Sequence, residues 1–177
     1  MLPFRHAHYL VFGCLLVTFV AFAPSYFLVL KDASPAHHLH GITATSWFVV
    51  LMVQSASIHH GRRRLHVWAG RASLLLVPWL TAGGLLVTQV TLLRDSSFAL
   101  LFGHDLAVAD AVATLAFALL FTLALRHRRD PERHARYLLA TLTPLAPPVL
   151  ARICSGYVPG LTIRSAEELP RFGGAID

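Results

Sequence analysis

The chain has 177 residues, of which 55% are hydrophobic and only 14% are charged. Soluble domains carry about 25% charged residues, so this composition, with its uncharged runs of about 20 residues, excludes an ordinary soluble domain and predicts an integral membrane protein. The net charge of +6 does not indicate a nucleic-acid partner. The arginines are concentrated in two short loops between apolar runs, where they favour positive-inside topology and binding to anionic lipid headgroups.

The apolar runs predict an all-α integral membrane helical bundle that forms one domain over residues 1–153. A helix of about 20 residues crosses a hydrocarbon core about 30 Å thick. We expect five transmembrane helices, over about residues 9–30, 42–58, 68–93, 105–125 and 137–153. The first is expected to bend near Pro24, and Lys31–Gly41 and Arg94–His104 are expected to be loops. Residues 154–177 are expected to form a polar, poorly ordered tail.

The basic residues predict which side of the membrane each loop faces. By alternation of the spans, the two loops that hold most of the arginines lie on one side, together with Arg5. These loop arginines are Arg62, Arg63, Arg64, Arg71, Arg126, Arg128, Arg129, Arg133 and Arg136. The opposite loops hold only Lys31 and Arg94. We therefore expect a bacterial cytoplasmic (inner) membrane protein with its N-terminus in the cytoplasm and its C-terminus outside.

Four histidines lie at the ends of the expected spans. His40 and His104 open spans on the outer side, and His66 and His134 open spans on the inner side. Because a helix rises 1.5 Å per residue, His40 and His66 are roughly 25–40 Å apart and cannot share an ion. Each same-side pair can meet, as the axial ligands of haem b do at two levels of a four-helix bundle. Alternatively, these rings reach the interface and bind headgroups.

The second span carries a polar stripe. His40, Trp47 and Gln54 are spaced by seven residues and therefore share one helix face. Lipid cannot satisfy such groups, so the stripe must face protein, water or a bound molecule. A packed interface in which Gln54 bonds to a neighbouring helix and a cofactor or substrate cavity are both compatible with this pattern.

Asp110 and Arg152 are charged residues at the outer ends of apolar spans. An isolated charge at such a depth is costly, so we expect the two residues to lie close to each other as a structural ion pair, or close to Asp105 or His104, inside the bundle. A proton relay is the alternative interpretation.

Three segments carry a resemblance to a known group of proteins. They are the His40, Trp47 and Gln54 stripe; Leu65–Arg71, which is similar to a Leu-His-Arg-x-x-Gly-Arg pattern; and Asp130–Thr141, which contains Arg-His-x-Arg and leads to Arg152. Together these segments resemble uncharacterised bacterial multi-pass membrane proteins of unknown function. The resemblance implies the membrane fold and points to His40, His66, His134 and Arg152 without assigning chemistry. The layout of the histidines is also similar to that of two-haem membrane cytochromes b.

The first functional hypothesis is a b-type haem membrane protein that transfers electrons. His66 and His134 would form one axial pair, and His40 and His104 a second. Tryptophans would pack on the porphyrins and arginines would pair with the propionates. The candidates for these contacts are Trp47, Trp68, Arg63, Arg71 and Arg136.

The second hypothesis is an accessory subunit without a cofactor, which holds lipid, quinone or a partner protein in a groove beside Gln54. Its histidines would be interfacial. Neither hypothesis decides whether the protein is an enzyme, but the sequence has no serine elbow and no His-Glu-x-x-His motif. Cys14 and Cys154 form neither a disulfide framework nor a metal motif.

Overall fold

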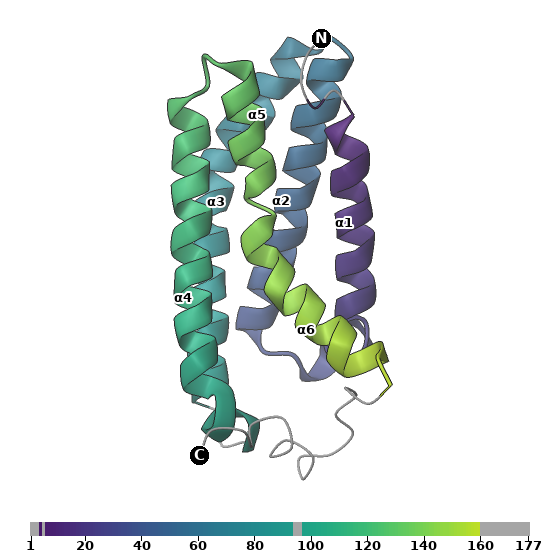
Figure 1. Ribbon diagram of the computed structural model, residues 1–177, viewed down its shortest axis with the longest axis vertical. Coiled ribbons are helices and arrows are strands. Elements are labelled where there is room, and N and C mark those ends of the chain that lie inside the picture. The colour runs from purple at the N-terminus through teal and green to yellow at the C-terminus, as the bar shows by residue number, and fades with distance from the viewer. Residues whose placement is uncertain (1–3, 5, 94–96, 160–177) are drawn as a thin grey trace.

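The computed structural model describes residues 4, 6–93 and 97–159 of the chain. All regular secondary structure in this part of the chain is helical, as the sequence predicted, and the helices stand side by side in an elongated bundle (Figure 1). The elements are α1 (Ala7–Phe22), the 3-10 helix η1 (Phe27–Asp32), α2 (Pro35–His59), α3 (Arg63–Leu92), α4 (Ser97–Arg126), α5 (Pro131–Ala140), the 3-10 helix η2 (Thr143–Leu145) and α6 (Ala146–Tyr157).

Four helical segments of the described chain are long and apolar enough to cross a membrane. They are Pro35–His59, Arg63–Leu92, Gly103–Arg126 and Pro131–Tyr157. Their outer faces carry exposed leucines, such as Leu75 at 74% and Leu115 at 70% exposure. A large apolar surface of this kind suits lipid rather than water. Helix α1 is also apolar, but its 16 residues extend only about 24 Å, so the fifth span is not established by length.

The first apolar run does not form one bent helix. Helix α1 ends at Phe22, and the chain turns before η1 begins at Phe27. Pro24 lies in this turn, where it lacks the N–H group that a continuing helix would need and restricts the residue before it. The expected span over residues 9–30 is therefore replaced by a shorter helix and a separate 3-10 segment.

Both of the loops expected on the outer side, Lys31–Gly41 and Arg94–His104, are largely helical in the described residues. Helix α2 begins at Pro35, a first-turn position where the missing N–H costs nothing, so His40 lies in the second turn of a helix. Helix α4 begins at Ser97, so His104 also lies inside a helix. Helix α3 likewise begins at Arg63 rather than near residue 68. Hydropathy marks the membrane depth of a segment, whereas a helix continues into the polar layer until its backbone is capped or broken.

The last span is broken in the middle. Helix α5 ends at Ala140, and η2 (Thr143–Leu145) separates it from α6. Pro144 cannot donate a backbone hydrogen bond to the preceding turn. After the break, α6 leans toward α1 (Figure 1), where the Tyr157 hydroxyl donates to the Val20 carbonyl at 2.7 Å. The predicted tail falls mostly on residues 160–177, which lie outside the described residues, although α6 itself continues to Tyr157.

Trp47 lies at the centre of the bundle with no exposed surface. Its ring meets Phe117 and Phe121 of α4 edge-on, with centroids 5.3 and 5.6 Å away. Its indole Nε1 donates a 3.1 Å hydrogen bond to the Thr141 hydroxyl, just after α5. Trp47 therefore ties α2 to α4 and to the break in the last span.

We predict that Trp47→Phe lowers the free energy of unfolding by about 1–3 kcal/mol, because it removes a buried hydrogen bond and leaves a small void. Thermal unfolding in detergent measures the change. The matched control is Trp79→Phe on α3, where the ring is 60% exposed and the loss should be within about 0.5 kcal/mol. Equal effects of the two substitutions would show that the Trp47 contact does not hold the bundle together.

Candidate functional site

His66 and His134 meet at the end of the bundle that holds the α2–α3 and α4–α5 turns. Their ring centroids are 6.2 Å apart and the ring planes are inclined by 76°. Helix α3 packs on α2 and α4, while α5 packs on α4. The two imidazoles therefore reach each other across the bundle from helices that are not close neighbours.

Each of these imidazoles is held by a backbone carbonyl. Nδ1 of His66 lies 3.3 Å from the carbonyl oxygen of Gln54, and Nδ1 of His134 lies 2.8 Å from that of Ala124. A carbonyl oxygen only accepts, so in both rings Nδ1 is the donor and carries a proton. In the neutral ring, Nε2 then has the free lone pair. Histidines that bind metals through Nε2 are held by this same contact at Nδ1.

The separation of the rings fits two ligands on opposite sides of one metal. With a metal–nitrogen distance of about 2 Å on each side and about 1 Å from nitrogen to ring centre, the centroids of two such imidazoles are about 6 Å apart. In the described residues, no group of three or more His, Cys, Asp or Glu side chains could hold a metal ion. A bare ion would therefore lack ligands, whereas haem iron takes four nitrogens from its porphyrin and needs only two from protein.

Gln54 is a second polar residue beside this pair. The backbone carbonyl of Gln54 accepts a hydrogen bond from His66 Nδ1. The residue is 8% exposed, and its side-chain Oε1 is buried without a hydrogen-bond partner among the described residues. A Cβ at Gly70 would lie 3.1 Å from Gln54 Nε2, so the glycine on α3 makes room for the amide. The Gln54 side chain thus lies inside the bundle, and its amide oxygen Oε1 has no hydrogen-bond partner among the described residues.

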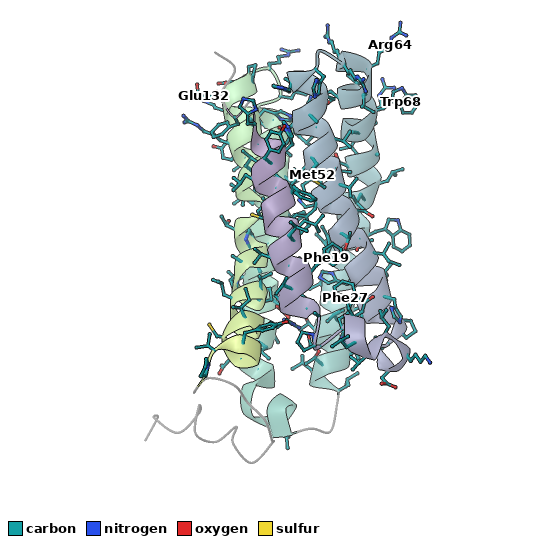
Figure 2. The ribbon with its side chains drawn as sticks, turned by 90° about the vertical axis from the view of Figure 1, so that its right-hand side faces the viewer. Phe19, Phe27, Met52, Arg64, Trp68 and Glu132 are labelled. Atoms are coloured by element: carbon teal, nitrogen blue, oxygen red, sulfur yellow. The ribbon has the colours of Figure 1, made fainter. Side chains whose placement is uncertain are left out.

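The arginines and Trp68 lie at the rim rather than between the histidines. The Arg71 guanidinium lies over the Trp68 ring at 5.8 Å, and Trp68 is 68% exposed. Arg136 pairs with Glu132 on the surface of α5, and Arg63 borders a shallow depression beside Trp68. Figure 2 shows Arg64 and Trp68 pointing outward at the same end as Glu132. In this structure the predicted propionate partners lie beside Trp68 and Glu132, and none of them contacts the histidine pair in the described residues.

Trp47 does not line the histidine site. It was predicted as a cofactor contact, but its ring edges meet Phe117 and Phe121 and its N–H is bound to Thr141. Its role in the structure is to pack the core.

The predicted outer pair is not assembled. His104 is exposed on α4, and no ring contact joins it to His40 in the described residues. His40 instead packs against α3, where a Cβ at Gly83 would lie 3.3 Å from its Cα, and borders a cavity between α1, α2 and α6. Counting residues gave the two histidines the same depth, but depth does not determine which way each helix face is turned.

The predicted ion pair between Asp110 and Arg152 is also not formed. Asp110 Oδ2 accepts a 2.7 Å hydrogen bond from the Thr88 hydroxyl. Arg152 donates to the Ser25 hydroxyl at 3.2 Å and to the Pro148 carbonyl at 3.1 Å, and its guanidinium lies 4.0 Å from the centre of the Phe22 ring. The lean of α6 toward α1 carries Arg152 to these partners, while Asp110 of α4 stays near enough to interact with its charge.

A cluster of four histidines at the α2–α3 end was not predicted. The rings of His6, His8, His59 and His60 are in contact, with centroid separations of 4.8–6.3 Å. The backbone N–H of His8 also donates to the Ser55 hydroxyl at 3.1 Å. The signal in the sequence was the presence of histidines at the start of one span and the end of the next, which antiparallel neighbours bring together.

Comparison with protein families, characterised proteins and solved structures finds no match for this chain. The assignment of function therefore depends on the geometry of the chain itself.

We predict that Gln54→Leu leaves the stability of the haem-free protein unchanged or raises it, because the leucine removes a buried oxygen that has no partner. Thermal unfolding in detergent measures this, with the exposed Gln89→Leu on α3 as the control. A loss of more than about 2 kcal/mol at position 54 would mean that the amide makes a stabilising hydrogen bond in the folded protein.

Proposed function

We propose that the protein is a b-type haem-binding membrane redox protein in which His66 and His134 are the two axial ligands. The observation that carries the proposal is the pair of adjacent imidazoles, whose centroids are 6.2 Å apart and each of which is held through Nδ1 by a backbone carbonyl. When bound, haem supplies an iron that accepts and releases one electron. The chain supplies two neutral imidazoles already in the tautomer that leaves Nε2 available.

The surroundings of the pair support the same proposal. The Gln54 and Ala124 carbonyls orient the rings, so little side-chain freedom would be lost on binding iron. The arginines at this end supply positive charge for two propionates. Arg71 and Arg136 are held only by exposed contacts with Trp68 and Glu132, which are worth about 0–1 kcal/mol and are readily exchanged.

We extend the proposal to topology and location. Helix α1, counted as a span, gives five transmembrane segments in a bacterial inner membrane, with the N-terminus and the haem end on the cytoplasmic side. The turns Gly61–Arg62 and His127–Asp130 lie at the same end as the start of α1 (Figure 1), and both are flanked by arginines that favour the cytoplasm. The exposed arginines would bind anionic headgroups, and a membrane partner would deliver or accept the electron.

The optical spectrum tests haem binding. We expect the protein, expressed with adequate haem, to show a Soret band that shifts with dithionite and sharp reduced α and β bands. His66→Ala and His134→Ala should each abolish these bands, because one remaining imidazole cannot keep the iron six-coordinate and low-spin. His127→Ala, at the same end but stacked on Tyr137, should retain them. A flat visible spectrum from folded wild-type protein would contradict the proposal and favour a cofactor-free accessory subunit.

Cysteine labelling tests the topology. In a background with Cys14 and Cys154 replaced by alanine, a membrane-impermeant maleimide applied to intact spheroplasts should label Lys31→Cys and leave Arg64→Cys unlabelled. Both native residues are exposed, so accessibility in the protein does not limit either reaction. Labelling of Arg64→Cys alone would show the opposite orientation. Equal labelling of both variants in intact spheroplasts would show that the two positions do not lie on opposite sides of the membrane.

A further inference from the structure

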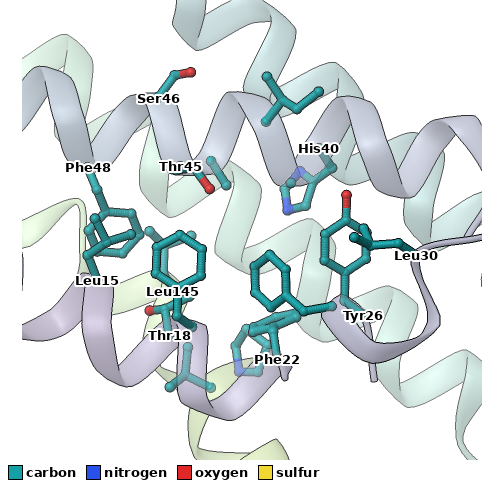
Figure 3. A pocket seen from close by; sticks show the side chains of 17 residues that line it. Leu15, Thr18, Phe22, Tyr26, Leu30, His40, Thr45, Ser46, Phe48 and Leu145 are labelled. Carbon is teal, nitrogen blue, oxygen red and sulfur yellow. The ribbon is translucent and has the colours of Figure 1, made fainter. Parts of the chain in front are cut away.

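A cavity of about 450 Å³ lies between α1, α2 and α6 (Figure 3). It is near the end of the bundle where α6 meets α1, opposite the end with the α2–α3 turn and the histidine pair (Figure 1). After the break at η2, α6 leans toward α1, and α1 stops at Phe22, which leaves this space between the two helices and α2. Hydrogen bonds from Arg152 to Ser25 and from Tyr157 to the Val20 carbonyl hold α6 against α1. The walls are thus fixed by the fold, although the cavity is not closed on all sides.

The walls are apolar and rich in aromatic rings. The aromatic side chains that line the cavity are Phe19, Phe22, Tyr26, Phe27 and Phe48. None of the lining residues is Lys, Arg, Asp or Glu. A phosphate headgroup would therefore find no cation on the wall, whereas a flat, neutral ring would find aromatic faces to pack on. This chemistry argues against a phospholipid headgroup as the occupant.

His40 provides an unpartnered polar group on this wall. Its ring extends from α2 toward the cavity (Figure 3), and its other side packs on α3, where a Cβ at Gly84 would lie 3.4 Å from Cε1. The Leu80 carbonyl is its polar neighbour on α3, but Nδ1 is buried and makes no hydrogen bond to any described residue. This atom lies on the α3 side of the ring, 3.6 Å from a Cβ placed at Gly84, so a guest with a hydrogen-bonding oxygen would bond to the other ring nitrogen, Nε2.

Two of the hydroxyl groups on the wall are already engaged within the protein. The Tyr26 hydroxyl is hydrogen-bonded to His38 Nδ1 at 2.9 Å. The Thr18 hydroxyl donates to the Cys14 carbonyl at 2.8 Å. The hydroxyls of Thr45 and Ser46, which also line the cavity, make no hydrogen bond to a described residue and remain available to a guest beside His40.

We propose that this cavity binds a lipid-soluble quinone, with His40 as its polar contact and the aromatic residues packed on its ring. A neutral imidazole donates to a quinone carbonyl or accepts from a quinol hydroxyl according to its tautomer, so the same residue suits both redox forms. The isoprenoid tail would leave through the open side into lipid. An acyl chain alone would offer no hydrogen bond to the polar groups on the wall. The site is independent of His66 and His134, so it stands whether or not haem binds.

Titration of the full-length protein with decylubiquinone tests the proposal. We expect saturable binding at one site in nanodiscs of zwitterionic phosphatidylcholine, measured by calorimetry. His40→Ala should weaken binding about tenfold, the loss of one hydrogen bond worth about 1.4 kcal/mol. Ala44→Phe, which places a ring in the cavity from its wall, should abolish binding. The matched controls, His104→Ala and Val49→Phe at exposed positions of the spans, should bind as the wild type does.

Two results would overturn the proposal. One is the absence of saturable binding by folded wild-type protein, with folding confirmed by thermal unfolding. The other is undiminished binding by both His40→Ala and Ala44→Phe. Native mass spectrometry that finds a phospholipid retained at one copy, and not displaced by decylubiquinone, would instead assign the cavity to lipid. His66→Ala should bind decylubiquinone normally, so failure of the haem proposal can be distinguished from failure of this one.

Discussion

Inside an apolar layer, every polar group must find its partner within the protein, because lipid offers none. Most of the interior obeys this constraint: Trp47 is bonded to Thr141, and Asp110 to Thr88. In the described part of the chain, the buried side-chain atoms left without a partner are His40 Nδ1 and Gln54 Oε1. Both belong to α2 and are about 21 Å apart along its axis. One belongs to a residue that lines the cavity, and the other belongs to the residue whose backbone carbonyl accepts from His66.

The break between α5 and α6 accounts for several features at once. It brings the Thr141 hydroxyl to the Trp47 N–H, and it lets α6 lean onto α1. That lean moves Arg152 to Ser25 and Phe22 and opens the space lined by Phe22 and His40. An unbroken last helix would continue along the axis of α5, and these contacts with α1 would not form. The prolines of this segment thus shape the outer half of the bundle.

The sequence predicts the helices and the depth of each residue better than it predicts which side chains meet. The stripe of His40, Trp47 and Gln54 follows from the helical period, and the structure does turn it inward. His66 and His134 could be assigned to one side by counting residues, and they do meet. The same count paired His40 with His104, which make no ring contact with each other in the described residues. It also paired Asp110 with Arg152, which interact electrostatically but form no ion pair there. Depth follows from a fixed rise per residue, whereas rotation and tilt depend on packing, on Gly83–Gly84 and on the break at η2.

The most direct test of the central claim is electron paramagnetic resonance of the oxidised, haem-loaded protein. If His66 and His134 hold the haem, a low-spin ferric signal is expected, with strong anisotropy if the bound rings keep the 76° angle between their planes. His134→Ala should convert this signal to a high-spin one or remove it. A ferric signal that is unchanged in both His66→Ala and His134→Ala would show that any haem is held elsewhere and would contradict the account.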